Sequence, residues 1–228
     1  MNNEIILLII ALVDLTLIFF SFRFGKEGLT GVIVVNIVLV STFGSQLVPV
    51  FGFLTNAGNV FYASIFLAMN MIIELYENRD ARRVIWVGFM ALVLFIIMGQ
   101  FVIRMHGAPE SLTINDSIAT LFHSVPRVAF ASICAYLVAQ YINLWLYRAL
   151  KSKHRERLLW LRNITSTSAA QIVDSVLFFS IAFLGLLPLH LIIQSILIGT
   201  AIKILVALLS TPFLYLARAS GTADIAGE

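Results

Sequence analysis

Charged side chains that interrupt long apolar stretches are the strongest chemical signal in this sequence. They are Asp14, Glu74, Arg127, Asp174 and Lys203. Residues 28–73 and 175–202, which border three of them, contain no Asp, Glu, Lys or Arg. A charge in the middle of a lipid bilayer is costly, so each of these groups is expected to meet a partner or a water-filled cavity. Their positions therefore mark candidate contacts for a polar solute.

Amide side chains accompany these charges at helical spacing. Gln140 and Asn143 are three residues apart, and Gln171 and Asp174 repeat this spacing. Residues three or four apart share one face of a helix, so two helices present donors and acceptors to the interior. Asp174 and Lys203 have opposite charges at a similar predicted depth, about 14 to 20 Å from the ends of their helices. Two interpretations remain open: the pair pins two helices together, or it serves a solute.

The apolar stretches are long enough to cross a membrane. About 20 residues at 1.5 Å rise cross roughly 30 Å of hydrocarbon. The chain is 60% hydrophobic with a mean hydropathy of +0.97, which excludes a separate water-soluble domain. We predict an all-α integral membrane protein with seven helices at residues 4–22, 29–50, 59–76, 84–104, 118–147, 163–184 and 190–217. In this arrangement Arg127 also lies near the midplane, where it binds a solute or caps backbone carbonyls.

Basic residues mark one side of this predicted bundle. Twelve of the 15 Lys and Arg residues fall in connections on that side. Because basic connections face the cytoplasm, we expect the N-terminus outside and the C-terminus in the cytoplasm of a plasma (cell inner) membrane. This orientation accounts for the pI near 9.2, so no nucleic-acid partner is expected. The first span lacks the basic start and cleavage site of a signal peptide and is expected to be retained.

Motifs of enzymes and metal sites do not occur in the sequence. There is no GxSxG, GxxxxGK[ST], HExxH or CxxC pattern, and Cys134 is the single cysteine. Catalysis at depth would need a paired nucleophile or a metal cluster. We therefore expect no enzyme activity, no cofactor and no metal site.

Four ordered motifs carry a family resemblance. Residues 67–83 read LAMNMIIELYENRDARR, a helix that ends before an Ala-Arg-Arg connection. The other motifs are Pro126-Arg127 with Ala131-Ser132, Ala135-Tyr136 and Gln140; Ser166-Thr167 with Gln171, Asp174 and Phe178-Phe179; and Lys203 with Thr211-Pro212 and Tyr215. This order resembles the queuosine precursor transporter family, also called the vitamin uptake transporter family, over residues 30–218.

The resemblance implies import of queuosine precursors, meaning 7-deazaguanine bases such as the cyano or aminomethyl form, or queuine. These bases are flat and rich in hydrogen-bonding groups, so a carboxylate is expected to accept from ring and amine N–H groups while an aromatic ring stacks. The expected substrate-binding residues are Arg127, Gln140, Gln171, Asp174, Lys203, Glu74, Asn70, Asn143 and Tyr136. The family commonly has Asp where this chain has Asn70 and Asn143, which puts proton coupling at those two positions in doubt.

The resemblance also divides the chain into an added N-terminal transmembrane helix at 1–28, a six-helix transporter core at 29–218 and a short polar cytoplasmic tail at 219–228. Two other functions remain open: a substrate-binding membrane subunit of an ATP-driven vitamin-type uptake system, and a structural membrane protein without a ligand. A homodimer and a separate energising module are both compatible with the sequence. The precursor carried, proton coupling versus facilitated diffusion, and the role of Asp14 are left open.

Overall fold

The computed structural model of the chain describes residues 2–44, 46–105, 108, 111–122, 126–154 and 158–225. Within them the elements, in chain order, are α1 (Asn3–Ser21), η1 (Phe22–Phe24), α2 (Gly25–Phe43), β1 (Leu47–Val50), β2 (Phe53–Asn56), α3 (Asn59–Leu75), α4 (Asn78–Val102), α5 (Leu112–Phe122), α6 (Pro126–His154), α7 (Leu159–Phe183) and α8 (Leu189–Ile225).

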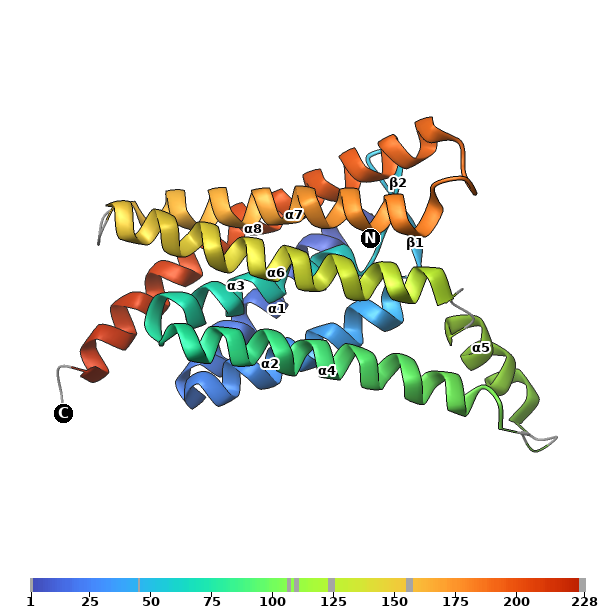
Figure 1. Cartoon of the computed structure of the whole chain (residues 1–228), viewed down its shortest axis with the longest axis horizontal. Helices are drawn as coiled ribbons and strands as arrows, with labels where there is room; N and C mark the ends of the chain where they lie inside the picture. The colour runs from blue at the N-terminus through green and yellow to red at the C-terminus, as the bar shows by residue number, and fades with distance from the viewer. Residues whose placement is uncertain are drawn as a thin grey trace.

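Long helices running back and forth along one axis make up the molecule (Figure 1). Among the described residues, five helical stretches are long and apolar enough to cross a membrane, and the first of them is α1 and α2 joined through η1. Helix α3 is shorter, with 17 residues. At 1.5 Å per residue it still spans about 25 Å, within the range of membrane helices. The prediction of an all-α polytopic membrane protein is confirmed.

Helix α3 is the centre of the bundle. Nearly all of its side chains are buried, and it packs against α1, α2 and α8, with further contacts to α4, α6 and α7. Helices α6 and α7 pack along one another more extensively than any other pair in the described chain. Ala139 of α6 and Ala170 of α7 meet there against Phe66 of α3. Small side chains let two helix backbones approach closely.

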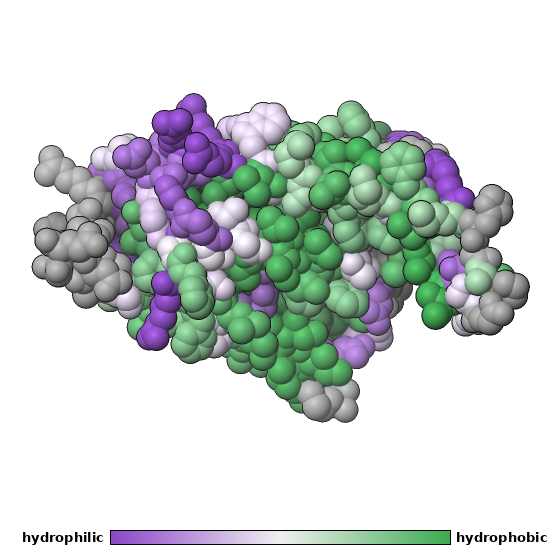
Figure 2. Space-filling model, turned by 90° about the horizontal axis from the view of Figure 1, so that it is seen from below, coloured by the Kyte–Doolittle hydropathy of each residue, from purple (hydrophilic) through white to green (hydrophobic). Residues whose placement is uncertain are grey.

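The two ends of the bundle differ in chemistry. We call one the hairpin end, because β1, β2, α5 and the α7–α8 connection lie there. We call the other the basic end, because the α1–α2, α3–α4 and α6–α7 connections lie there, with Lys26, Arg82, Lys151 and Arg218 on the adjoining helices. Figure 2 shows hydrophilic residues gathered over one end and a hydrophobic band across the middle. The band has the character of a lipid-facing surface.

A tight reversal joins α1 to α2 at the basic end. Gly25 has a positive φ of 69°, a conformation that favours glycine over every other residue. At Gly28 a Cβ atom would lie 2.3 Å from the carbonyl oxygen of Ser21, so no larger side chain fits. These two glycines allow α2 to return directly alongside α1.

The predicted helix at 29–50 is wrong at its C-terminal end. Helix α2 ends at Phe43, and β1 and β2 form an antiparallel hairpin in which Val50 pairs with Phe53. Phe51 and Gly52 have φ of 50° and 80°, the positive values that a tight two-residue hairpin turn requires. A short apolar stretch is compatible with helix and strand alike, so periodicity did not separate them.

The predicted helix at 118–147 is wrong at its start. Residues 112–122 form the separate helix α5, and α6 begins at Pro126 and continues to His154. Proline is favoured at the first position of a helix, because its missing N–H would be unpaired there in any case. At the other end of the chain, α8 continues to Ile225, beyond the predicted end at residue 217.

Candidate functional site

A cavity of about 950 Å³ lies in the half of the bundle nearer the hairpin end, with walls from α2, α3, α4, α6, α7 and α8. Most of its wall is aliphatic or aromatic. On each of the six helices one lining residue lies farthest from the hairpin end; these are Ile37, Tyr62, Leu92, Tyr136, Asp174 and Lys203. We call these six residues the cavity floor. Its polar members make it the place where a polar solute would be bound.

An ion pair occupies the cavity floor. Lys203 Nζ lies 2.8 Å from Asp174 Oδ2, and both residues are 6% exposed. The Tyr62 hydroxyl donates to Asp174 Oδ1 at 2.5 Å, and Lys203 Nζ lies 4.7 Å from the centroid of the Tyr62 ring. Lys203 also donates to Ser175 Oγ at 3.3 Å. The pairing predicted as one alternative is present, and the same pair faces a cavity.

Tyr136 is the second aromatic group of the cavity floor. Its hydroxyl donates to the Ile85 carbonyl oxygen at 3.4 Å and is buried against α4. A Cβ atom at Gly88 would lie 2.0 Å from this hydroxyl, so glycine at that position makes room for the tyrosine. The ring is thereby held at the cavity wall, where a flat solute can stack on it.

Two glutamines lie one helical turn beyond the cavity floor, toward the basic end. Gln140 follows Tyr136 by four residues on α6, and Gln171 precedes Asp174 by three on α7. They are 1% and 0% exposed, and neither the amide nitrogen nor the amide oxygen of either one has a hydrogen-bond partner in the protein. Buried amides are rarely unpaired. Their four polar atoms are therefore available to a solute that passes the cavity floor.

A network of asparagines follows these glutamines. Asn70 Nδ2 donates to Asn163 Oδ1 at 2.7 Å and to Thr167 Oγ1 at 2.9 Å, while Asn143 Nδ2 donates to Asn70 Oδ1 at 2.8 Å. Asn163 Nδ2 in turn donates to Thr211 Oγ1 at 3.0 Å. These bonds join α3, α6, α7 and α8. They close the interior of the bundle between the glutamines and the basic end.

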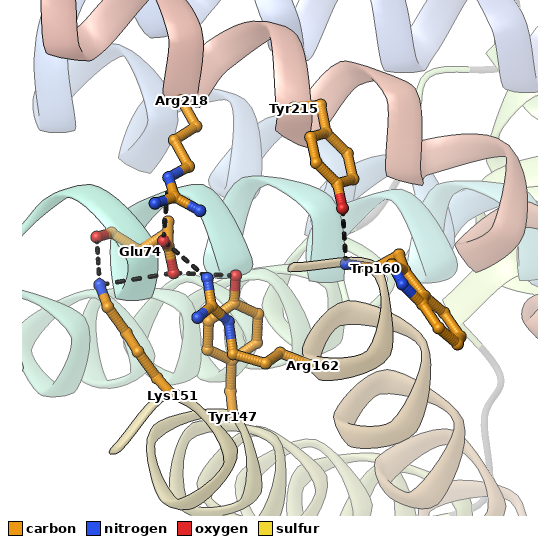
Figure 3. Close-up of polar contacts among 7 residues, drawn as sticks. All are labelled: Glu74, Tyr147, Lys151, Trp160, Arg162, Tyr215 and Arg218. Atoms are coloured by element: carbon orange, nitrogen blue, oxygen red, sulfur yellow. Dashed lines mark hydrogen bonds and ion pairs between the residues drawn. The ribbon is translucent and has the colours of Figure 1, made fainter. Parts of the chain in front are cut away.

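Glu74 organises the last polar layer, at the basic end (Figure 3). Its carboxylate lies 2.9 Å from Arg162 Nη2, 3.4 Å from Lys151 Nζ and 3.7 Å from Arg218 Nε. The Tyr147 hydroxyl donates to Glu74 Oε2 at 3.2 Å. One carboxylate of α3 thus contacts α6, α7 and α8 at once, and Arg162 and Glu74 are both buried.

These layers follow one another from the cavity floor to the basic end, and we call them together the polar seam. The described side chains that define the seam are Tyr62, Asn70, Glu74, Tyr136, Gln140, Asn143, Tyr147, Arg162, Asn163, Thr167, Gln171, Asp174 and Lys203. Arg162 and Asn163 are sequence neighbours, and all other successive members on one helix are separated by three, four or eight residues. Each helix therefore turns one face to the seam.

The structure distributes the predicted site residues over this seam. Asp174, Lys203 and Tyr136 belong to the cavity floor, and Gln140 and Gln171 lie one turn beyond it. Asn70 and Asn143 belong to the asparagine network, and Glu74 lies at the basic end.

Arg127 is the exception, because its predicted depth is wrong. As the second residue of α6 it lies at the hairpin end and is exposed. Its guanidinium donates to the carbonyl oxygens of Ile181 and Leu184, the latter at 2.7 Å. The later start of α6 is the physical reason. Arg127 caps the last carbonyls of α7, the alternative role considered from the sequence.

Tyr62, Asn163 and Arg162 are members of the seam that sequence reasoning missed. The signal for Tyr62 was present, since it precedes Asn70 by eight residues on α3, which places the two about 80° apart on one side of the helix. Arg162 lay within a basic connection and was assigned to membrane orientation, although the structure buries it completely.

Comparisons with known proteins agree with this architecture. Residues 56–217 match the family described as "Putative vitamin uptake transporter". A "Probable queuosine precursor transporter" of Bacillus subtilis (strain 168) is 34% identical over 200 residues, which are 86% of this chain and 85% of that protein. No solved structure matches the chain.

Two further relatives match over shorter lengths. A "Probable queuosine precursor transporter" of Haemophilus influenzae is 32% identical over 135 residues, 58% of this chain and 54% of that protein. A "Queuosine precursor transporter" of Escherichia coli (strain K12) is 28% identical over 148 residues, 64% of each chain. The resemblance predicted from the four motifs is confirmed. This chain belongs to the vitamin uptake transporter family, whose members are membrane transporters and not enzymes.

Proposed function

We propose that this protein imports queuosine precursors across the plasma membrane and binds their 7-deazaguanine base at the cavity floor. The observation that carries the proposal is the Asp174–Lys203 ion pair, flanked by Tyr62 and Tyr136, at the inner end of a cavity of about 950 Å³. Small-molecule sites typically measure about 300 to 1,000 Å³. A 7-deazaguanine base with a substituent on its five-membered ring is of suitable size.

The polar groups of the cavity floor complement the edge of such a base. A deazaguanine presents a ring N–H and an exocyclic amine side by side, next to a carbonyl oxygen. The Asp174 carboxylate accepts from the two donors, Lys203 donates to the carbonyl, and the Tyr136 ring stacks on the flat face. The substrate then replaces part of the contact between Lys203 and Asp174, so neither charge is left without a partner.

The polar seam is the path that we propose for translocation. In this conformation the cavity extends from its floor to residues at the hairpin end such as Gln100 and Arg104. Toward the basic end the asparagine network and the Glu74 contacts close the seam. We propose that the hairpin end faces outward, so that this conformation admits the base from outside. Opening the two closed layers releases it to the cytoplasm.

The division of the chain follows the same proposal. Helices α2–α8 supply the cavity and the seam, and we propose that they form the transport core. Helix α1 lies outside both. It is an additional helix fastened to the core, with Glu4 Oε1 accepting from the Phe51 backbone N–H at 2.8 Å.

Uptake by this chain alone in proteoliposomes tests the proposal and separates it from an ATP-driven system. We expect labelled 7-cyano-7-deazaguanine to enter without added ATP, and excess guanine to compete poorly, because it lacks the substituent. Asp174→Asn should abolish uptake. Asp80→Asn is a matched control, because Asp80 pairs with Lys26 at the basic end, away from the cavity. Uptake by Asp174→Asn at the wild-type rate would contradict the proposal.

A further inference from the structure

Among the described residues three carboxylates are buried within the helices, and one of these three has no cationic partner. Asp174 pairs with Lys203 at 2.8 Å, and Glu74 pairs with Arg162 at 2.9 Å. Asp14 of α1 is 7% exposed, and no Lys, Arg or His of the described chain lies within ion-pair distance of it. The twelfth residue of α1 therefore places an acid near the middle of the bundle without a charge to balance it.

The hydrogen bonds around Asp14 leave two acceptor atoms without a hydrogen-bond partner, although the Ser64 hydroxyl of α3 faces the carboxyl group. Asn36 Nδ2 of α2 donates to Asp14 Oδ1 at 3.1 Å and also to the Val32 carbonyl oxygen at 3.2 Å. Asp14 Oδ2 and Asn36 Oδ1 are both buried, and neither has a hydrogen-bond partner. A proton on Asp14 Oδ2 turns this buried oxygen into a donor and removes the charge of the carboxylate.

The ionisable groups on the elements around α1 are engaged elsewhere or lie at the bundle ends. Helix α1 packs against η1, α2, β1, α3 and α8. The Asn36 amide and the Ser64 hydroxyl face Asp14. The ionisable residues with described side chains on these elements are Arg23, Lys26, Glu27, Tyr62, Glu74, His190, Lys203, Tyr215 and Arg218. Tyr62 and Lys203 contact Asp174, and Arg218 contacts Glu74. None supplies a positive charge to Asp14.

We propose that Asp14 is a proton-binding site through which import of the base is coupled to the proton gradient. An ionised carboxylate without a cation is costly in a membrane interior, so the site holds its proton while it is closed from water. The proton adds to Oδ2 from water on one side of the membrane and returns to water on the other. The inference rests on the proposed function for the identity of the solute.

A short physical path joins Asp14 to the cavity floor. Asn36 directly precedes Ile37, which lines the cavity. A Cβ atom at Gly88 would lie 3.0 Å from Ile37 Cδ1 and 2.0 Å from the Tyr136 hydroxyl, so these two side chains of the floor pack at one point of α4. When Asp14 loses its proton, its hydrogen bond with Asn36 of α2 changes. A resulting shift of α2 moves Ile37, and with it the part of the cavity wall against which Tyr136 packs.

Proteoliposomes with an imposed pH gradient test the coupling. Wild-type protein should accumulate labelled 7-cyano-7-deazaguanine when the exterior is more acidic, and a protonophore should return the internal concentration to equilibrium. Asp14→Asn, which resembles the permanently protonated acid, should exchange internal for external base at nearly the wild-type rate but never accumulate it. Asp116→Asn is the control, because Asp116 is exposed on α5. Accumulation by Asp14→Asn equal to wild type, or accumulation driven by sodium and not by pH, overturns the inference.

An infrared measurement tests the proton itself without relying on uptake. In the purified protein, a protonated carboxylic acid has a carbonyl stretch distinct from that of a carboxylate, and Asp14→Asn should remove one such band. A spectrum of Asp14→Asn that retains every protonated-acid band overturns the inference. If labelled base equilibrates across the membrane but does not respond to the pH gradient, the proposed coupling is wrong and the proposed function stands. If no base enters under any gradient, the proposed function is wrong. The infrared result then shows by itself whether Asp14 binds a proton.

Discussion

Lys203 and Asp174 are in direct contact at 2.8 Å, on helices α8 and α7, at the inner end of a cavity. The contact neutralises both charges where water is scarce, and the cavity gives a solute access to them. A buried ion pair is weak evidence of stability, because desolvation offsets the attraction. Its position on the cavity floor is the reason why we propose a role in solute binding for this pair.

Removing one member of this pair should destabilise the protein more than removing both. Asp174→Asn or Lys203→Met leaves a buried charge without its partner, at a cost of about 3 to 5 kcal/mol. The double variant should melt nearer to wild type in detergent, while uptake remains lost in all three. Thermal melts of the purified variants measure this coupling. Additive losses in the double variant would rule out a direct energetic interaction.

Tyr62 should contribute through its hydroxyl and its ring separately. Tyr62→Phe removes the hydrogen bond to Asp174 and is expected to cost about 1.5 to 3 kcal/mol, the range for bonds to a charged group. Tyr62→Leu should cost more, since the ring beneath Lys203 is also lost. The control is Tyr215→Phe, which removes a longer 3.3 Å contact with the Trp160 backbone N–H. Equal melting temperatures for Tyr62→Phe and wild type would show that the Tyr62 hydroxyl does not stabilise the protein through Asp174.

Glu74→Gln should loosen the basic end. A neutral amide leaves Arg162, Lys151 and Arg218 to repel one another, so the closed layer should open more often. A thiol at Ser210, introduced in a Cys134→Ser background, reports on this because Ser210 is buried beside the asparagine network. In inside-out vesicles an impermeant maleimide should label it faster in Glu74→Gln than in wild type.

Asp80→Asn is the control for that experiment, since its ion pair with Lys26 is partly exposed and surface ion pairs contribute little to stability. Labelling of the Ser210 thiol should therefore stay at the wild-type rate. Unchanged labelling in Glu74→Gln as well would show that the Glu74 contacts do not restrict access from the basic end.

Orientation in the membrane follows from the basic end. A cytoplasmic reporter fused after Arg218 should be active, and an external reporter should be active when inserted after Thr113 of α5, because basic connections face the cytoplasm. External reporters active at both positions would contradict both the proposed orientation and an odd number of crossings between α5 and the C-terminus.

The sequence by itself determined the fold class, the family and the approximate place of each long helix. Lipid imposes a local requirement, since each crossing segment must be long, apolar and helical, and such a requirement can be read within about 20 residues. Spacing along single helices also indicated the interior faces of α6 and α7, including Gln140, Gln171 and Asp174. Buried positions for these three are confirmed.

Only the tertiary structure decided which polar groups meet. Tyr62 contacts Asp174 112 residues away, and Glu74 contacts Arg162 88 residues away, so no local pattern relates them. The same holds for the exposed position of Arg127, which depends on α6 beginning at Pro126, beside the last turn of α7. Asp14 was recognised as a buried acid, but its lack of a cation is a property of the packed bundle. Contacts between helices far apart in sequence depend on how side chains fill the space between them. The spacing of residues within one helix does not show which other helices pack against it.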